Sequence, residues 1–384
     1  MEAYLDNSAT TKCRQEVIDL MVQSMQEDFG NPSSMHQKGL DAENYIKEAR
    51  SRIAKTLKVK DKEIYFTSGG TEGNNMAIIG GAMANKRTGN KVITTSIEHA
   101  SVGNPFAYLE KQGFEVTYLP VDGYGVIDLE ALKKEMTPET ILVSIMMVNN
   151  EIGAVEPVEE AARIIHEANP NCLFHVDAIQ AYGKMQILPA RWGIDLLTVS
   201  GHKIHGPKGS GFIYIREKAK VLPQILGGGQ ELGMRSGTEN VPAIAGLGLA
   251  AKLAYDDLDA NGAHLYELRD ALIVGLSQID GVTINGKLDH ENAPQIVSVS
   301  VRGVRAEVLL HALEDKGIYV SAGSACSSNK PAVSKTLKAI GLDKELLDQT
   351  VRMSLCYFST MDEIDYTVET MSQLVPMLKK YSRR

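Results

Sequence analysis

The hydrophobic positions of the chain form short apolar runs that alternate with longer amphipathic stretches. Between residues 63 and 215 the apolar runs are typical of buried strands, and helical periodicity lies between most of them. The expected strands cover residues 63–67, 91–95, 115–120, 141–148, 172–176, 196–199 and 211–215. This alternation predicts an α/β layer built on a mostly parallel sheet.

A second kind of pattern begins near residue 242. The expected elements are two amphipathic helices, a strand, a helix and a strand, at residues 242–257, 262–279, 296–301, 306–316 and 318–320. Such a mixture is typical of a smaller α+β domain. We therefore predict a large domain of residues 15–259 and a small domain formed by residues 1–14 together with 260–384.

Composition places the chain among ordinary globular proteins. Of the 384 residues, 43% are hydrophobic and 23% are charged, and the formal net charge is −8. Because no long basic run occurs, nucleic acid is not expected as a direct ligand. The longest apolar stretch, residues 141–148, is too short to cross a bilayer, and residues 1–6 do not resemble an export signal. We expect a cytoplasmic protein that does not bind membranes.

The cysteines give no sign of a structural framework. Cys13, Cys172, Cys326 and Cys356 lie far apart, without a C-x-x-C pair, so neither a disulfide framework nor a zinc or cluster site is expected. A reducing compartment is consistent with this pattern.

Polar residues that can perform chemistry collect just after the predicted strands. In an open α/β sheet, ligands bind beyond the carboxyl ends of the strands. The residues found there are Gly70, Thr71, His99, Asn150, Asp177, Gln180, Ser200, His202 and Lys203. A lysine at the mouth of a buried strand is costly unless it has a partner or a role, and a Schiff base with a carbonyl cofactor is one such role.

These residues include the parts that a pyridoxal phosphate site needs. The carboxylate of Asp177 could keep the pyridine nitrogen protonated, and a helix start at residues 70–71 could hold the phosphate. His99 could stack on the ring. Lys208 is a second candidate for the Schiff base, but its proline and glycine neighbours indicate a turn, so Lys203 is favoured.

Taken together, the motifs resemble those of the cysteine desulfurases of the NifS/IscS type, which are fold-type I pyridoxal phosphate-dependent enzymes. The matching segments are residues 4–11, 29–34, 66–72, 98–99, 149–153, 175–180, 200–203, 206–209, 227–231, 235–240 and 323–326. The most specific are Arg-Ser-Gly-Thr-Glu-Asn at residues 235–240 and Gly-Ser-Ala-Cys at residues 323–326. The resemblance implies a large cofactor-binding domain and a small domain that carries a catalytic cysteine loop.

The resemblance also implies a role for each residue of the cofactor site. Lys203 would hold pyridoxal 5'-phosphate as a Schiff base, Asp177 would pair with the pyridine nitrogen, and Gln180 with the ring hydroxyl oxygen. His99 would stack on the ring and take part in proton transfer. The phosphate would lie against Gly70, Thr71, Ser200 and His202. Because the family's threonine at the position of Thr238 reaches the phosphate of the partner subunit, a homodimer is implied.

Three further residues are implied to act on the substrate. Asn150 and Arg352 would hold it, with the guanidinium of Arg352 paired to its carboxylate. Cys326 lies in a polar stretch, which is typical of an exposed thiol rather than a structural one, and its thiolate would attack the substrate sulfur.

The implied reaction converts L-cysteine into L-alanine and leaves the sulfane sulfur on Cys326 as a persulfide. An acceptor protein would then take the sulfur for Fe–S cluster assembly or for tRNA or cofactor thiolation. A selenocysteine lyase or a related β-eliminase is the alternative, since it would share every cofactor residue and differ in whether Cys326 is essential. An aminotransferase has no use for Cys326, and a non-catalytic relative would not need the complete site.

Overall fold

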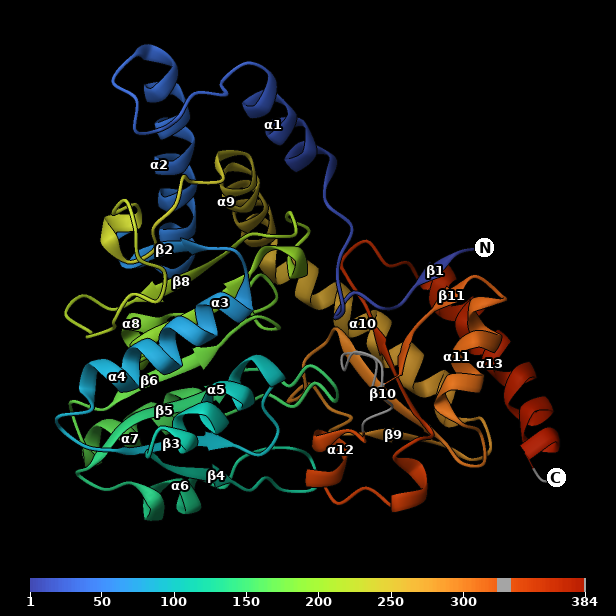
Figure 1. Cartoon of the computed structure of the whole chain (residues 1–384). Helices are drawn as coiled ribbons and strands as arrows, with labels where there is room; N and C mark the ends of the chain where they lie inside the picture. The colour runs from blue at the N-terminus through green and yellow to red at the C-terminus, as the bar shows by residue number, and fades with distance from the viewer. Residues whose placement is uncertain (323–332, 383–384) are drawn as a thin grey trace.

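A mixed seven-stranded sheet forms the centre of the larger part of the computed structural model, which describes residues 1–322 and 333–382 (Figure 1). The strand order is β2–β8–β7–β6–β5–β3–β4; β8 is antiparallel to both neighbours and the other pairs are parallel. The strands are β2 (Ile64–Thr67), β3 (Lys91–Thr95), β4 (Glu115–Leu119), β5 (Thr140–Met146), β6 (Leu173–Asp177), β7 (Leu196–Ser200) and β8 (Gly211–Ile215). The predicted mostly parallel sheet is thus confirmed.

Both faces of this sheet are buried, which explains why its strands appear in the sequence as continuous apolar runs. Leu142 and Leu196 pack on one face, whereas Val143 and Leu197, the next residues, pack on the other because side chains alternate along a strand. The first face is covered by α3 (Gly70–Asn75), η2 (Met76–Gly80), α4 (Gly81–Asn85) and α5 (Ala100–Lys111). The second is covered by α2 (Gln37–Leu57), α6 (Leu129–Glu135), α7 (Val158–Ala168), α8 (Pro189–Trp192) and α9 (Val241–Asp256).

Helices α1 (Gln15–Gln26) and α2 project beyond the sheet and pack against α9 (Figure 1). At the crossing of α2 and α9, a Cβ on Gly248 would lie 2.4 Å from the Cα of Ala49, so glycine permits the close approach. Several apolar side chains at the far end of α1 and α2 are exposed, among them Met25, Phe29 and Met35.

A four-stranded antiparallel sheet organises the smaller part of the molecule, in the order β12–β13–β10–β9. Its elements are β9 (Val282–Asn285), β10 (Ile296–Val301), β12 (Ser321–Ala322), β13 (Thr350–Ser354), α10 (Leu258–Ser277), α11 (Ala306–Glu314), α12 (Lys335–Ala339) and α13 (Met361–Ser382). The strand expected at 318–320 divides into β11 (Ile318–Tyr319) and β12. The reason is that β11 pairs with β1 (Ala3–Tyr4) while β12 joins the four-stranded sheet at β13.

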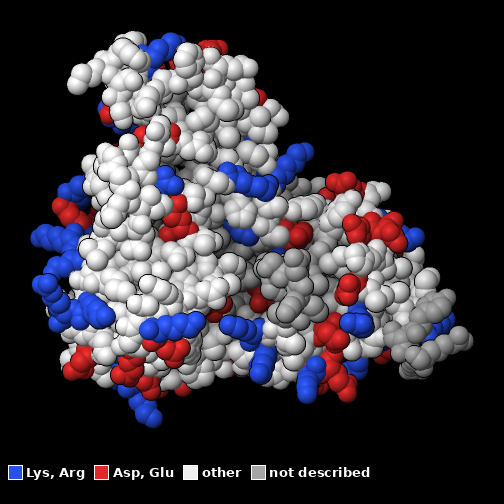
Figure 2. Space-filling model, viewed as in Figure 1, with Lys and Arg blue, Asp and Glu red and all other residues white. Residues whose placement is uncertain are grey.

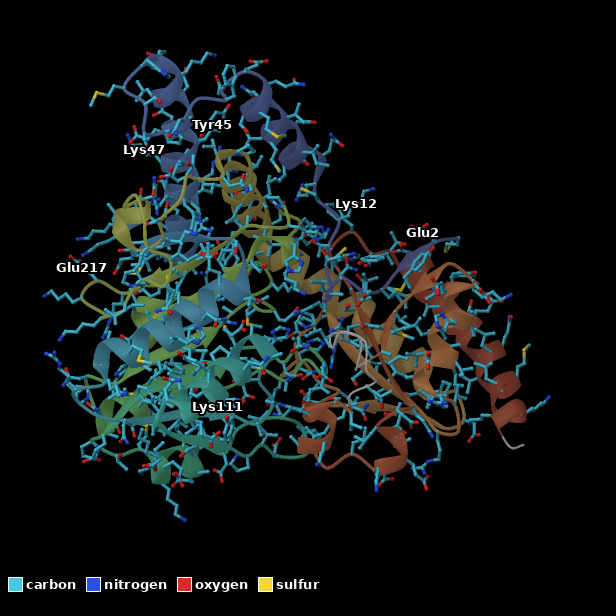
Figure 3. All side chains as sticks on the ribbon, viewed as in Figure 1. Glu2, Lys12, Tyr45, Lys47, Lys111 and Glu217 are labelled. Carbon is cyan, nitrogen blue, oxygen red and sulfur yellow. The ribbon has the colours of Figure 1, made fainter. Side chains whose placement is uncertain are left out.

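The N-terminal segment connects the two parts. β1 is parallel to β11, and Ala3 and Leu5 belong to the smaller hydrophobic core. A few residues later, the N–H of Thr11 donates to the carbonyl of His202, at the edge of the large sheet. In Figure 3, Glu2 lies beside β1 and Lys12 lies where the segment climbs towards α1. Residues 3–5 and 265–375 share a hydrophobic core, and on this basis we propose the division into residues 15–259 and residues 1–14 with 260–384.

The surface carries charges of both signs on the same face, without a broad patch of one sign in the view of Figure 2. Among the described helices, none is both long enough and apolar enough to cross a membrane.

Candidate active site

A cavity of about 210 Å³ opens at the carboxyl ends of β6 and β7. It brings together ten of the residues expected from the sequence: Gly70, Thr71, His99, Asn150, Asp177, Gln180, Ser200, His202, Lys203 and Arg352. Thr238 does not line it; this threonine is exposed, between η4 (Glu231–Gly233) and α9. Cys326 lies outside the described residues.

Lys203 stands in the short turn η3 (Gly201–Lys203) directly after β7. Its Nζ donates to the carbonyl oxygens of Ser8 at 2.5 Å and Ala9 at 2.7 Å, which aims the amine across the cavity at the N-terminal segment. Its own carbonyl accepts from Nζ of Lys184 at 3.0 Å. Lys208 is exposed and does not line the cavity, so the geometry favours Lys203 as the reactive amine.

Asp177 ends β6 and is only 4% exposed. Oδ1 accepts from the N–H of Ile179 at 3.0 Å and Oδ2 accepts from Nδ2 of Asn74 at 2.8 Å. Burial raises the pKa of this carboxyl group, while the hydrogen bonds and the nearby His99 and Lys203 oppose that rise. A buried carboxylate of this kind is stabilised by a cationic partner, and a protonated pyridine nitrogen is one.

A hydrogen-bonded chain joins Asp177 to His99 and determines the tautomer of the imidazole. Asn74 Nδ2 also donates to Oγ of Ser101 at 2.9 Å, so the Ser101 hydroxyl is free to donate to Nδ1 of His99 at 2.7 Å. The backbone N–H of Ser101 donates to the same Nδ1 at 3.1 Å. Nδ1 is therefore an acceptor, and the ring proton resides on Nε2. Burial lowers the pKa of His99 against the opposing effect of Asp177, and Lys203 lowers it further, which keeps the ring neutral at pH 7.

Small or neutral groups line the part of the cavity around Gly70 and His202. A Cβ on Gly70 would lie 2.1 Å from Cδ1 of Ile179, so glycine leaves this space open without displacing that side chain. His202 contacts Thr10 Oγ1 through Nδ1 at 3.2 Å. Burial, together with neighbouring lysines, lowers the pKa of His202 to about 4, so its imidazole is a neutral hydrogen-bonding group at pH 7.

The residues present fit pyridoxal phosphate. Among the described residues, the buried Oε1 of Gln180 has no hydrogen-bond partner, although its Nε2 donates to the carbonyl of Ser8 at 3.0 Å. An unpartnered buried oxygen is costly, and the hydroxyl of the cofactor ring is a group that could pair with it. The cavity thus supplies an amine, a buried carboxylate, an imidazole and a space kept open by glycine.

Arg352, on β13, reaches the cavity from the small domain and is 5% exposed. Its Nη1 donates to the carbonyl of Asn150 at 2.8 Å, and its Nη2 donates to Oδ1 of Asp6 at 2.9 Å. Nε is buried and finds no partner within the described part of the chain. A guanidinium with donors remaining is suited to a carboxylate.

A second cavity of about 200 Å³ adjoins the first and shares His99, Asn150 and Arg352 with it. Ala322 and Val333, which flank residues 323–332, both line this second cavity. The segment that carries Cys326 therefore leaves and rejoins the described chain beside the proposed substrate site.

Reasoning from the sequence did not find Asn74, Ser101 or Ser8, which hold the reactive groups in place. Asn74 lies one helical turn after Gly70, and Ser101 lies in the first turn of the helix that His99 caps. These positions, close to Gly70 and His99 in the sequence, are the features from which a role for Asn74 and Ser101 could have been inferred. Ser8 acts through its backbone carbonyl, so its side chain gave no indication of the role.

Comparison with known proteins agrees with this geometry. A description of the aminotransferase class-V family matches residues 3–367. The cysteine desulfurase IscS of Methanosarcina thermophila is 44% identical over 379 residues, which cover 99% of this chain and 93% of that protein. The solved structure of a NifS-like protein superimposes with a TM-score of 0.93 at 38% identity and covers 98% of this chain and 100% of that one.

A further solved structure, of SspA in complex with cysteine, has a TM-score of 0.81 at 34% identity and covers 93% of this chain and 100% of that one. The similarity is therefore not confined to the cofactor site but extends along almost the whole sequence. The chain belongs to the aminotransferase class-V family, among the cysteine desulfurases of the NifS/IscS type.

Proposed function

We propose that the chain is a pyridoxal phosphate-dependent cysteine desulfurase, which converts L-cysteine to L-alanine and carries the sulfane sulfur as a persulfide on Cys326. The observation that carries this proposal is the single cavity in which Lys203, Asp177 and Arg352 meet. The IscS and NifS-like relatives, and the cysteine bound to SspA, support L-cysteine as the substrate.

Lys203, Asp177, Gln180 and the residues around Gly70 are the groups that would hold the cofactor. When bound, pyridoxal phosphate supplies an aldehyde that bonds to amines and a ring that accepts electrons from the substrate. Asp177 would hold a proton on the pyridine nitrogen, because a buried carboxylate and a cation beside it stabilise each other. The phosphate would lie against Thr71, Ser200 and His202.

The substrate is oriented by its carboxylate and loses a proton to a neighbouring amine. The guanidinium of Arg352 would bind the carboxylate, with Asn150 beside it. Nζ of Lys203 would remove the Cα proton as a general base. Nε2 of His99, which carries the ring proton, would donate it during the proton transfers that follow.

Cys326 would accept the sulfur. Its thiolate sulfur forms an S–S bond while the Cβ–S bond of the substrate breaks, and the electron pair left on Cβ takes up a proton to give alanine. The position of Ala322 and Val333 on the second cavity supports this role, because it brings the ends of the cysteine segment beside Arg352.

The Cys326→Ser variant tests the reaction type. We expect it to bind the cofactor and to change its absorption when L-cysteine is added, yet to release no sulfide under reducing conditions. Cys356→Ser is the matched control, since Cys356 is a half-buried thiol whose pKa is raised by burial. Sulfide release at the normal rate from Cys326→Ser would contradict the proposal and favour a β-eliminase.

We also propose a homodimer in which Thr238 reaches the cofactor phosphate of the partner subunit. The exposed Leu226 and Leu232, on the same loop as Thr238, support an apolar interface there, and Glu231 joins this loop to α2 through Arg50 at 2.7 Å. Mixing Lys203→Ala chains with Thr238→Ala chains should restore activity, because each mixed dimer has one site with both residues intact. No gain over the separate variants would contradict the shared site.

The sulfur acceptor is proposed to be an Fe–S scaffold or a tRNA- or cofactor-thiolation enzyme, in the cytoplasm. Loading Cys326 with labelled sulfur from L-cysteine and adding candidate acceptors one at a time would identify it by transfer of the label.

A further inference from the structure

Asp6 is ion-paired with Arg352, whose guanidinium is proposed to bind the substrate carboxylate. Its Oδ1 accepts from Nη2 of Arg352 at 2.9 Å, and the side chains are 23% and 6% exposed respectively. No other carboxylate is ion-paired with Arg352 among the described residues. The positive charge of the proposed carboxylate site is thus balanced before any ligand arrives.

The guanidinium nevertheless keeps donors for a ligand. Of its five N–H groups, Nη2 uses one on Asp6 and Nη1 uses one on the carbonyl of Asn150. The buried Nε–H has no partner in the described ranges, and each Nη keeps a second N–H. A ligand carboxylate can therefore be hydrogen-bonded by Arg352, but the charge that attracts it is already shared.

The backbone on both sides of Asp6 is held by hydrogen bonds; on the N-terminal side, the N–H of Leu5 donates to the carbonyl of Tyr319 at 2.9 Å. The carbonyl of Asp6 accepts from the N–H of Ala9 at 3.0 Å, and the N–H of Asn7 donates to the carbonyl of Ser354 at 3.3 Å. The side chain of Asn7 ties the segment again to the Ser354 carbonyl, at 3.0 Å. An incoming carboxylate consequently meets a second anion on a backbone that is anchored beside Arg352.

We propose that Asp6 is a built-in counter-anion of Arg352 that weakens the binding of ligand carboxylates, so that the product L-alanine is not retained through its carboxylate. The inference rests on the proposed function, in which Arg352 binds the substrate carboxylate. Asp6 acts through Arg352, as a positioning residue, and does not itself need to touch the ligand. Its effect belongs to the carboxylate alone and not to the amine or side chain of the ligand.

The test compares L-alanine with L-alanine methyl ester as ligands of the cofactor-loaded Asp6→Asn variant. Asparagine keeps the size and the Oδ1 acceptor but removes the charge. We expect the dissociation constant for L-alanine, followed by the absorption of the cofactor, to fall about threefold to tenfold, and that of the ester to stay unchanged. Asp343→Asn, which loses an exposed pair with Arg302, is the matched control and should alter neither constant.

A misfolded variant would lose both ligands together, so the ratio of the two constants reports only on the carboxylate. An unchanged or weaker affinity of Asp6→Asn for L-alanine relative to the ester would overturn the inference. Arg352→Gln separates this failure from that of the proposed function. If Arg352→Gln weakens L-alanine far more than the ester, the carboxylate site stands whatever Asp6 does; if it does not, both the site and the inference fall.

Discussion

The two walls of the active-site cavity are built on different principles. On the large-domain wall, Asp177, His99 and Lys203 each lie at or just after the carboxyl end of a parallel strand, and a hydrogen-bonded chain through Asn74 connects two of them. The other wall is made by the N-terminal segment and by Arg352 from the small domain. The sheet thus positions the residues proposed to react. Segments distant in the sequence orient Lys203 Nζ and supply Arg352, the proposed carboxylate-binding residue.

Removing the amine of Lys203 should produce the largest loss of activity, and it tests the large-domain wall by itself. Lys203→Ala is expected to lose covalently held cofactor and its absorption, and kcat should fall by roughly 10³-fold or more. Lys208→Ala is the matched control, because Lys208 is exposed and outside the cavity. Retention of covalently bound cofactor by Lys203→Ala would transfer the role to Lys208.

Breaking the chain of hydrogen bonds on the same wall should have a smaller effect. Asn74→Ala removes a donor from Asp177 Oδ2 and from Ser101, so the pKa of Asp177 should rise further and the acid limb of the kcat/KM profile should move to higher pH. We expect roughly tenfold lower kcat/KM at pH 7. Asn85→Ala, which loses only contacts of its side chain with backbone carbonyls, should leave the profile in place.

A substitution in the small-domain core should loosen the N-terminal segment, which forms part of the other wall of the cavity. Leu5→Ala should lower the free energy of unfolding by about 2–5 kcal/mol, because Leu5 is fully buried, and it should also weaken cofactor binding, since Ser8 follows it. Leu309→Ala removes the same atoms from the same core on α11. Cofactor affinity and denaturant unfolding are measured for both variants. Equal losses of cofactor affinity would show that the effect of Leu5→Ala comes from lower overall stability and not from the N-terminal segment that orients Lys203.

The smallest expected effect is on the pH dependence of stability and concerns His175, a fully buried residue of β6. Burial lowers the pKa of His175 to about 3, while Ser144 and Thr198 hold its ring nitrogens at 2.8 and 3.1 Å. The unfolded chain takes up a proton below about pH 6.5 and the folded one does not, so this group makes the protein less stable as the pH falls from 6.5 towards 3. In urea titrations at pH 7, 6 and 5, His175→Gln should lose less stability per pH unit than wild type, by up to ~1.4 kcal/mol. Parallel curves would contradict this.

The sheet wall was predictable because strand period and strand ends are local properties of a sequence. Apolar runs locate the strands, and Asp177 and Lys203 are found by reading the residues that follow them. The antiparallel placement of β8 and the small-domain strand β13 required the structure, since pairing is decided by partners far along the chain.

The other wall was only partly predictable. The motif at residues 4–11 and Arg352 were noticed through resemblance, but no periodicity connects Asp6 with a residue 346 positions later. Ser8 holds Lys203 through a backbone carbonyl, which any residue could provide. Asn74 gave a weak signal as well, because a helical asparagine ordinarily faces solvent or bonds its own helix.

The pairing of β1 with β11 has a consequence for biosynthesis. Ala3 lies opposite Ile318, and Asp6 lies opposite Ser354, so residues 3–6 can pair only after residues 318–354 have been made. The large sheet is complete by Ile215 and can begin to fold while the rest is being translated. Lys203 meets its carbonyl acceptors, Ser8 and Ala9, only when the N-terminal segment docks, so the site is completed after residues 318–354 have been made and not when the large sheet is finished.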